Sequence, residues 1–73
     1  FIAQGGDDRT VPIQNSILMY QACKAAGVPA EIHIFEHGGH GFGLALRDPS
    51  LRVWPDLAVS WLQLNKILPP ATK

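Results

Sequence analysis

Two loops of this 73-residue chain carry the side chains that are best suited to chemistry. The loop at residues 5–10 contains the adjacent carboxylates Asp7 and Asp8, and the loop at residues 36–43 places His40 between glycines. An aspartate that accepts a hydrogen bond from a histidine fixes the tautomer of the imidazole and stabilises the imidazolium ion. Asp8 and His40 could therefore form the acid–base half of a hydrolytic triad.

The segments that flank these loops predict a strand, a helix and a second strand. Residues 1–4 form a short apolar segment, and residues 30–35 combine two isoleucines and a phenylalanine in the partly alternating pattern of a strand. Between them, Pro12 suits the start of a helix and Gly27 its end. Most of the intervening residues are good helix formers, so we expect a strand–helix–strand unit.

A second helix is expected to begin near Trp54 and to end at the Pro69-Pro70 pair. A proline and an acidic residue in the first turn favour the start, and prolines cannot continue a helix. Apolar side chains recur at helical spacing along this stretch: Leu57, Trp61, Leu64 and Leu68. Residues 44–53 have no regular pattern. Trp54 and Trp61 are expected to pack in the core rather than to form a platform for a sugar, although Trp54 lies close enough to the histidine loop to line the edge of a pocket.

The order of these elements predicts an α/β protein. A strand–helix–strand unit normally forms a crossover between parallel strands, and ligands of such sheets bind beyond the carboxyl ends of the strands. Both loops leave such ends, so they should emerge at one edge of the sheet, where Asp8 and His40 could meet. Because two strands and two helices enclose a small core, we expect the unit to belong to a larger α/β domain.

Both loops also match sequence patterns of a known family. Residues 4–12, which read Q-G-G-D-D-R-T-V-P, resemble the α/β-hydrolase pattern H/x-G-x-x-D-x-x-V-P, and residues 38–42 resemble its G-G-H-G-F loop. The resemblance extends over residues 1–64 and points to acetyl-xylan-esterase-like and prolyl-oligopeptidase-like hydrolases. It implies that Asp8 is the triad acid and His40 the triad base. No cofactor and no metal is expected.

The chain departs from the family pattern at two points. Gln4 stands where many relatives have histidine, which we expect to affect only hydrogen bonding within the loop. In addition, none of the serines, at positions 16, 50 and 60, lies in a G-x-S-x-G nucleophile elbow. We therefore expect the nucleophile and the oxyanion hole to lie upstream. Residues 1–73 would then be the C-terminal strand–helix–strand–loop–helix fragment of a single α/β-hydrolase catalytic domain, inactive alone.

The composition agrees with this expectation and excludes other classes of protein. Only 16% of the residues are charged, against about 25% in typical domains, as expected where missing elements cover much of the surface. The net charge is zero, so nothing predicts nucleic-acid binding. No apolar run approaches the ~18 residues that span a bilayer, so no membrane partner is expected. The single cysteine, Cys23, excludes an internal disulfide and is expected to pack as a small apolar residue.

The resemblance implies a serine-type carboxylic ester hydrolase that acts on short acyl esters, including acetylated carbohydrate. Two alternatives stay open: a prolyl-oligopeptidase-type serine peptidase, and a non-catalytic binding module on the hydrolase scaffold. A G-x-S-x-G motif upstream would favour an enzyme, whereas its replacement would favour the binding module. The chain predicts neither an oligomeric state nor a localisation, although members of the family are often exported.

Several of these residues also have simpler interpretations. Asp8 could cap the first helix, and Asp7 is expected to be a solvated loop residue. His33, His37 and His40 are spaced in a way that suggests zinc ligands, but a strand and a glycine loop do not gather them on one helical face. His33 is therefore expected to pack across the strands, and His37 to be a polar loop residue.

Overall fold

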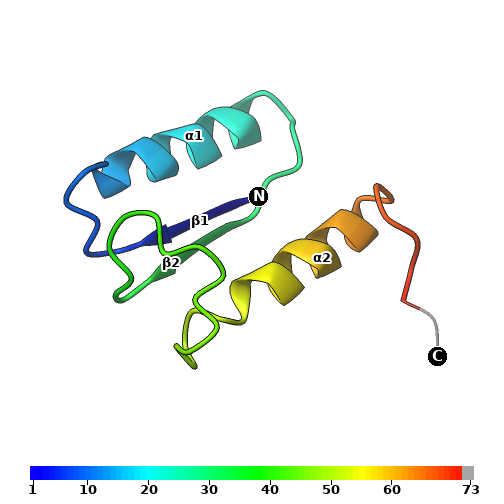
Figure 1. The fold of residues 1–73 in the computed structure, drawn as a ribbon. Helices are drawn as coiled ribbons and strands as arrows, with labels where there is room; N and C mark the ends of the chain where they lie inside the picture. The colour runs from blue at the N-terminus through cyan, green and yellow to red at the C-terminus, as the bar shows by residue number, and fades with distance from the viewer. Residues whose placement is uncertain (72–73) are drawn as a thin grey trace.

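The computed structural model describes residues 1–71. Strand β1 (Ile2–Gly5), helix α1 (Ile13–Ala25), strand β2 (Ile32–Phe35) and helix α2 (Trp54–Leu64) follow one another along the chain, as Figure 1 shows. This is the predicted order of elements, and each strand begins slightly later than expected. The segment between β2 and α2 contains turns but no helix or strand in the part of the chain that the structure describes.

The strands β1 and β2 form a two-stranded parallel sheet. Ile2 pairs with Ile32 and Gly5 pairs with Phe35, so the two strands end side by side. The loop after β1 and the loop after β2 therefore leave the sheet at the same edge (Figure 1). This confirms the prediction that the carboxyl ends of the strands bring the two chemistry-bearing loops together.

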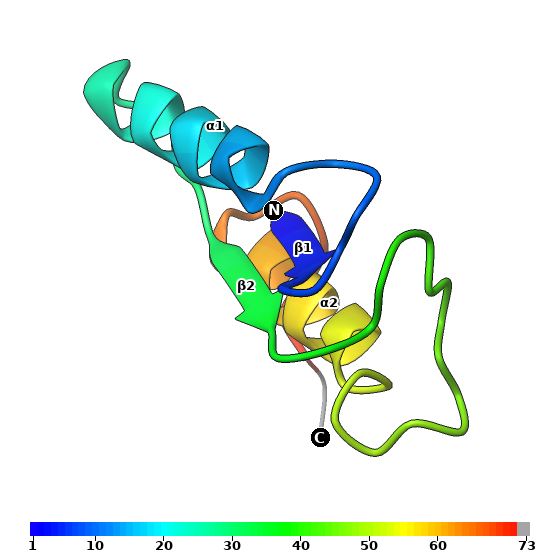
Figure 2. The same cartoon turned by 90° about the vertical axis from the view of Figure 1, so that its left-hand side faces the viewer.

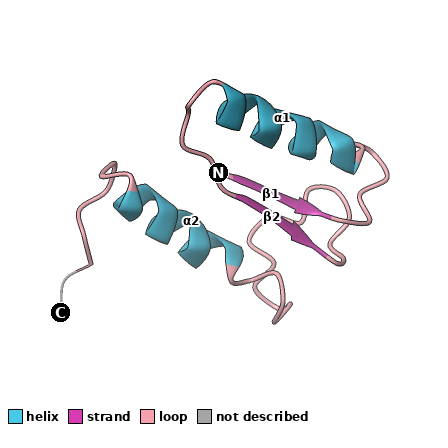
Figure 3. Cartoon of the chain, turned by 180° about the vertical axis from the view of Figure 1, so that it is seen from behind, coloured by secondary structure: helices cyan, strands magenta, loops and turns pink. Residues whose placement is uncertain are grey.

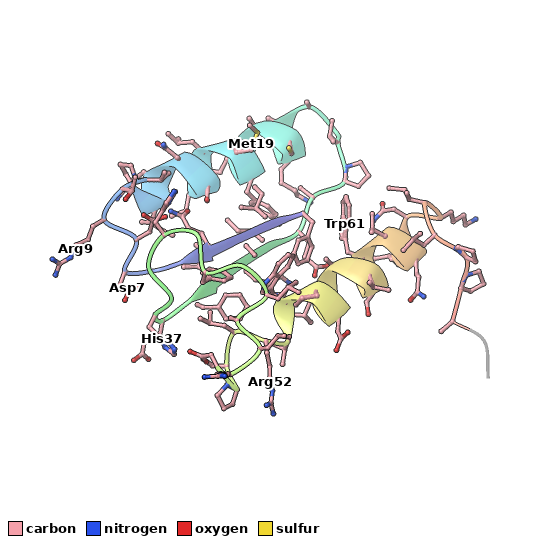
Figure 4. The ribbon with its side chains drawn as sticks, viewed as in Figure 1. Asp7, Arg9, Met19, His37, Arg52 and Trp61 are labelled. Carbon is pink, nitrogen blue, oxygen red and sulfur yellow. The ribbon has the colours of Figure 1, made fainter. Side chains whose placement is uncertain are left out.

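The two helices cover opposite faces of the sheet. Figures 1 and 3, seen from opposite sides, both show α1 on one side of the strands and α2 on the other, and Figure 2 shows the same layers after a quarter turn. In Figure 4, Trp61 of α2 points toward the strands, whereas Met19 of α1 points away from them. Helices on both faces are typical of parallel sheets in α/β proteins.

Helix α1 is bounded by the residues that the sequence singled out. Pro12 precedes its first residue with φ −58°, which suits the entry to a helix. Gly27 follows its end with φ +71°, a left-handed conformation that glycine adopts without a steric penalty. These two residues set the length of α1 and thereby allow β2 to return beside β1.

Helix α2 ends earlier than predicted, at Leu64. The side chain of Asn65 donates to a carbonyl oxygen of the last turn at 3.0 Å, and Lys66 has φ +61°. A side-chain hydrogen bond and a left-handed residue therefore end the helix before the prolines are reached. The prediction that Leu68 continues the helical stripe was wrong, and Leu64 is itself 76% exposed.

The described strands and helices enclose very little buried apolar core. The principal extents of the unit are 38 × 35 × 14 Å, and within residues 1–71 Leu51 is the one large apolar side chain that is buried. Large apolar side chains are exposed on α1, β2 and α2, among them Leu18, Met19, Ile34 and Val59. The low content of charged residues thus corresponds to apolar surface that these elements leave uncovered. No helix in residues 1–71 is long and apolar enough to cross a membrane.

Candidate active site

Asp8 lies in the loop between β1 and α1, and its two carboxylate oxygens have different partners. Oδ1 accepts the backbone N–H groups of Thr10 and Val11 at 2.8 and 2.9 Å. An aspartate that binds the backbone two and three residues further on stabilises a tight turn. Asp8 therefore organises the backbone just before α1, but the simpler interpretation that it caps the helix was wrong, because no side-chain hydrogen bond caps α1. Oδ2 serves other groups.

The second oxygen of Asp8, Oδ2, faces His40. Nδ1 of His40 lies 3.1 Å from this oxygen, and Nε2 of Gln4 donates to it at 3.2 Å. The side chain of Asp8 is only 4% exposed, whereas that of His40 is 53% exposed. The structure thus brings together the two residues that the sequence analysis singled out, which we call the acid–base pair. The carboxyl group of Asp8 is buried, and the imidazole of His40 is half exposed.

The surroundings of Asp8 favour its ionised form. The N–H of Val11 is the largest influence that holds the pKa of Asp8 well below its usual value, although burial of the carboxyl group acts in the opposite direction. Hydrogen bonds from His40, Thr10 and Gln4 lower this pKa further. A carboxylate here accepts the Nδ1 proton of His40, so the lone pair of Nε2 is directed away from Asp8. An imidazole in this tautomer can take up a proton at Nε2.

Close packing of two glycines brings the His40 loop against the Asp8 loop. A Cβ atom at Gly5 would lie 2.7 Å from the carbonyl oxygen of Gly39 and 2.8 Å from its nitrogen, which is too close for any side chain. Gly39 has φ +62°, so the residue before His40 needs a left-handed conformation. Gly5 therefore permits the contact between the loops, and Gly39 permits the turn that precedes His40.

Asp7 links the same two loops through a hydrogen bond. Its Oδ1 accepts the backbone N–H of Gly39 at 2.8 Å. In Figure 4, Asp7 and His37 both lie at the end of the sheet where the two strands finish. Asp7 is exposed, as predicted for a solvated loop residue, but it also has a backbone partner 32 positions away that the sequence did not reveal.

Gln4 is a site residue that the sequence analysis underestimated. It is 7% exposed. Besides binding Asp8, its Nε2 donates to the carbonyl oxygen of Val11 at 2.9 Å, and its Oε1 accepts the hydroxyl of Ser16. Gln4 therefore connects β1, the Asp8 loop and α1. The expectation of an effect within the loop alone was wrong, and the available signal was a polar residue at the end of an apolar strand.

A second histidine–aspartate pair closes the loop that carries His40. Nε2 of His37 lies 2.6 Å from Oδ2 of Asp48, and Oδ1 of Asp48 accepts the N–H and the hydroxyl of Ser50 at 2.9 and 2.7 Å. We call His37 and Asp48 the loop clamp. The hydrogen bond that His37 donates to Asp48 and the negative charge of Asp48 raise the pKa of His37, and hydrogen bonds from Ser50 and His37 lower the pKa of Asp48. This pair was not predicted, although the Asp-Pro-Ser turn at 48–50 was a signal for it.

His33, on β2, has different partners from the other two histidines. Its Nε2 lies 2.6 Å from Oε2 of Glu31, and its ring centroid lies 5.4 Å from that of Phe1. This contact across the strands confirms the expected packing role. Within residues 1–71, no group of three or more His, Cys, Asp or Glu side chains is arranged to hold a metal ion.

A hollow of about 240 Å³ opens beside the acid–base pair. Its walls include Asp8 and His40 from the loops and Ser16 from α1. A second hollow of about 290 Å³ shares Phe42 with the first and is lined by Trp54. The indole N–H of Trp54 donates to the carbonyl oxygen of Gly43 at 2.8 Å, which fixes the ring at the edge of the site, the alternative to core packing.

Comparison with a solved structure agrees with this arrangement. The crystal structure of an acetyl ester-xyloside bifunctional hydrolase from Caldicellulosiruptor lactoaceticus matches with a TM-score of 0.85 and 39% sequence identity. The match covers 90% of this chain and 24% of that one, so this chain spans about a quarter of the length of the solved hydrolase. No curated protein matches the chain significantly.

These elements therefore form part of an α/β-hydrolase fold, as the resemblance of the two loops implied. The model of the prolyl oligopeptidase family matches residues 1–62, a range that contains both Asp8 and His40. Because the match covers most of the sequence, this chain belongs to the prolyl oligopeptidase family.

Proposed function

We propose that this chain supplies the acid, Asp8, and the base, His40, of a Ser–Asp–His triad in a serine-type carboxylic ester hydrolase. The nucleophilic serine would come from a part of the protein outside residues 1–73, because no serine here lies in a G-x-S-x-G elbow. The observation that carries the proposal is the 3.1 Å contact between Nδ1 of His40 and Oδ2 of Asp8, at the sheet edge where ligands of α/β proteins bind.

In this mechanism, Nε2 of His40 takes the proton of the serine hydroxyl as the serine oxygen attacks the acyl carbon of the ester. Asp8 stabilises the imidazolium ion and stays ionised because its pKa is held low. His40 then gives the proton to the departing alcohol, which leaves an acyl-serine. In the second half, His40 takes a proton from water, the water oxygen attacks the acyl carbon, and the proton returns to the serine as the acid departs.

We propose short acyl esters, including acetylated carbohydrate, as the substrates. The solved hydrolase that is 39% identical to this chain is described as an acetyl ester-xyloside hydrolase, which supports this class. The second hollow also supports it, since the rings of Phe42 and Trp54 line a space suited to the apolar face of a sugar.

A serine peptidase is the second candidate, and the match to the prolyl oligopeptidase family favours it. The same acid–base pair would serve either reaction, so the two functions are distinguished by which substrate the protein hydrolyses more efficiently. The test compares kcat/KM of the intact protein for an acetylated xylo-oligosaccharide with kcat/KM for a proline-containing peptide anilide. We expect the ester to be the better substrate, and the reverse order would assign a peptidase.

The triad is tested by replacing His40→Gln in the intact protein. Loss of the base should lower turnover of an acetyl ester by about 10⁴-fold or more and prevent covalent labelling by a fluorophosphonate. His33→Gln is the matched control, because His33 also contacts a carboxylate at 2.6 Å but packs beside Phe1. It should retain most of the activity. Wild-type turnover in the His40→Gln protein would rule out the triad, whereas absence of turnover in the unaltered intact protein would favour a binding module.

A further inference from the structure

Asp7 binds the backbone immediately before His40. Its Oδ1 accepts the N–H of Gly39 at 2.8 Å, while the neighbouring Asp8 binds the His40 ring at 3.1 Å. Two adjacent carboxylates of one loop thus hold two adjacent residues of the other. We propose that Asp7 is a positioning residue, whose carboxylate oxygen fixes the Gly39 backbone so that Nδ1 of His40 stays against Asp8. This inference rests on the proposed role of the acid–base pair.

The loop around His40 needs such a tether because it has little stiffness of its own. Gly38, Gly39 and Gly41 have φ values of +135°, +62° and +70°, and glycines lose more conformational freedom on ordering than any other residue. The side chain of His40 is half exposed, so packing alone does not hold it. A directional hydrogen bond to the preceding N–H is therefore the contact best placed to set the position of the imidazole.

The contact between Gly5 and Gly39 cannot replace this hydrogen bond. Steric packing limits how closely the loops approach, as the 2.7 Å separation from a Cβ at Gly5 shows, but it does not define the direction of the Gly39 N–H. A catalytic group displaced by about 1 Å can lose about 100-fold in rate. What Asp7 supplies here is an acceptor oxygen, and asparagine at this position retains one.

The experiment compares Asp7→Ala, Asp7→Asn and Asp56→Ala in the intact protein, with an acetyl ester as substrate. Asp7→Ala should lower kcat by about 100-fold with little change in KM, because the tether positions the base and does not bind the substrate. Asp7→Asn should stay within about tenfold of wild type. Asp56→Ala, which removes an exposed acid in the first turn of α2, should leave kcat unchanged.

A second measurement reports on the tether without catalysis. Hydrogen exchange of the Gly39 amide should become faster in Asp7→Ala than in Asp7→Asn, while amides of β1 keep their protection. Wild-type kcat in Asp7→Ala, or equal losses in the Ala and Asn variants, would overturn the positioning role. If His40→Gln and Asp8→Asn also kept full activity, the proposed function itself would be wrong, so the two failures can be told apart.

Discussion

The acid–base pair and the loop clamp are both histidine–aspartate pairs, yet they are built in opposite ways. His40 reaches an aspartate of another loop, 32 positions away, through Nδ1. His37 reaches Asp48, 11 positions away in its own loop, through Nε2. The first geometry directs Nε2 away from the acid, whereas the second uses Nε2 for the contact. The two pairs thus use different ring nitrogens, and His37 uses Nε2 to fasten its own loop to Asp48.

The two acids also differ in their surroundings, although the pKa of each is held low. Asp8 is 4% exposed and Asp48 is 30% exposed. The largest influence on Asp8 is a backbone N–H of a tight turn, while the largest on Asp48 is the hydroxyl of Ser50. Both acids accept backbone N–H groups two and three residues further on, but water can reach the partly exposed Asp48 and replace its partners more easily than those of the buried Asp8. The same Asp→Asn substitution should therefore change turnover by different amounts in the two pairs.

The largest expected difference lies between Asp8→Asn and Asp48→Asn. Asparagine at position 8 keeps the shape but favours the wrong imidazole tautomer, a change that costs about 10⁴-fold in turnover in a serine protease. Asp48→Asn weakens only the loop clamp and should leave turnover within about tenfold. Turnover of one acetyl ester by the intact variants, with folding checked by circular dichroism, measures both. Similar losses in the two variants would show that the two pairs share one role.

A smaller loss of kcat than in Asp8→Asn is expected from Gly5→Ala, for which Gly27→Ala is the control. The new Cβ at position 5 would lie 2.7 Å from the Gly39 carbonyl oxygen, so the His40 loop must move and kcat should fall by about 10- to 100-fold. Nothing lies within 4 Å of a Cβ at Gly27, whose φ is +71°. Gly27→Ala should therefore cost about 1 kcal/mol of stability and leave kcat intact. Urea unfolding and steady-state kinetics separate the effects, and unchanged kcat in Gly5→Ala would contradict this account.

The smallest effect concerns the pH dependence of the loop clamp. The folded protein raises the pKa of His37 above its usual 6.5, so the stabilisation by this histidine is complete below pH 6.5 and is lost as the pH rises through the raised value. The low pKa of Asp48 contributes stability that is present above pH 3.8 and is lost as the pH falls through its folded value. The clamp should therefore stabilise the fold most between these limits.

His37→Gln tests this window. The substitution should lower Tm more at pH ~5 than at pH ~8, and the difference should be small because the side chain is half exposed and solvent screens its charge. His33→Gln again serves as the control, measured in the same buffers. An equal decrease of Tm at both pH values would mean that the clamp acts through packing and not through its charge.

The meeting of Asp8 with His40 could be predicted because parallel strands bring their carboxyl ends to one edge, whatever the details of the loops. The hydrogen bond from the Gly39 N–H to Asp7 could not be predicted, because a backbone N–H has no signature in the sequence. The end of α2 could not be read from apolar spacing either, since Asn65 and the left-handed Lys66 end it. Periodicity predicts regular elements, but the contacts of single loop residues depend on tertiary structure.

The turn that delivers the Val11 and Thr10 N–H groups to Asp8 has a consequence for the charge that forms on His40. These dipoles are fixed by the backbone, so they need no reorganisation when the imidazole becomes a cation. Since they make Asp8 a weak base, the Nδ1 proton stays on the ring when Nε2 gains a second one. In the proposed mechanism, each proton transfer then moves a single proton between Nε2 and the reacting oxygen, and the Asp8 carboxylate acts as a stationary counter-ion.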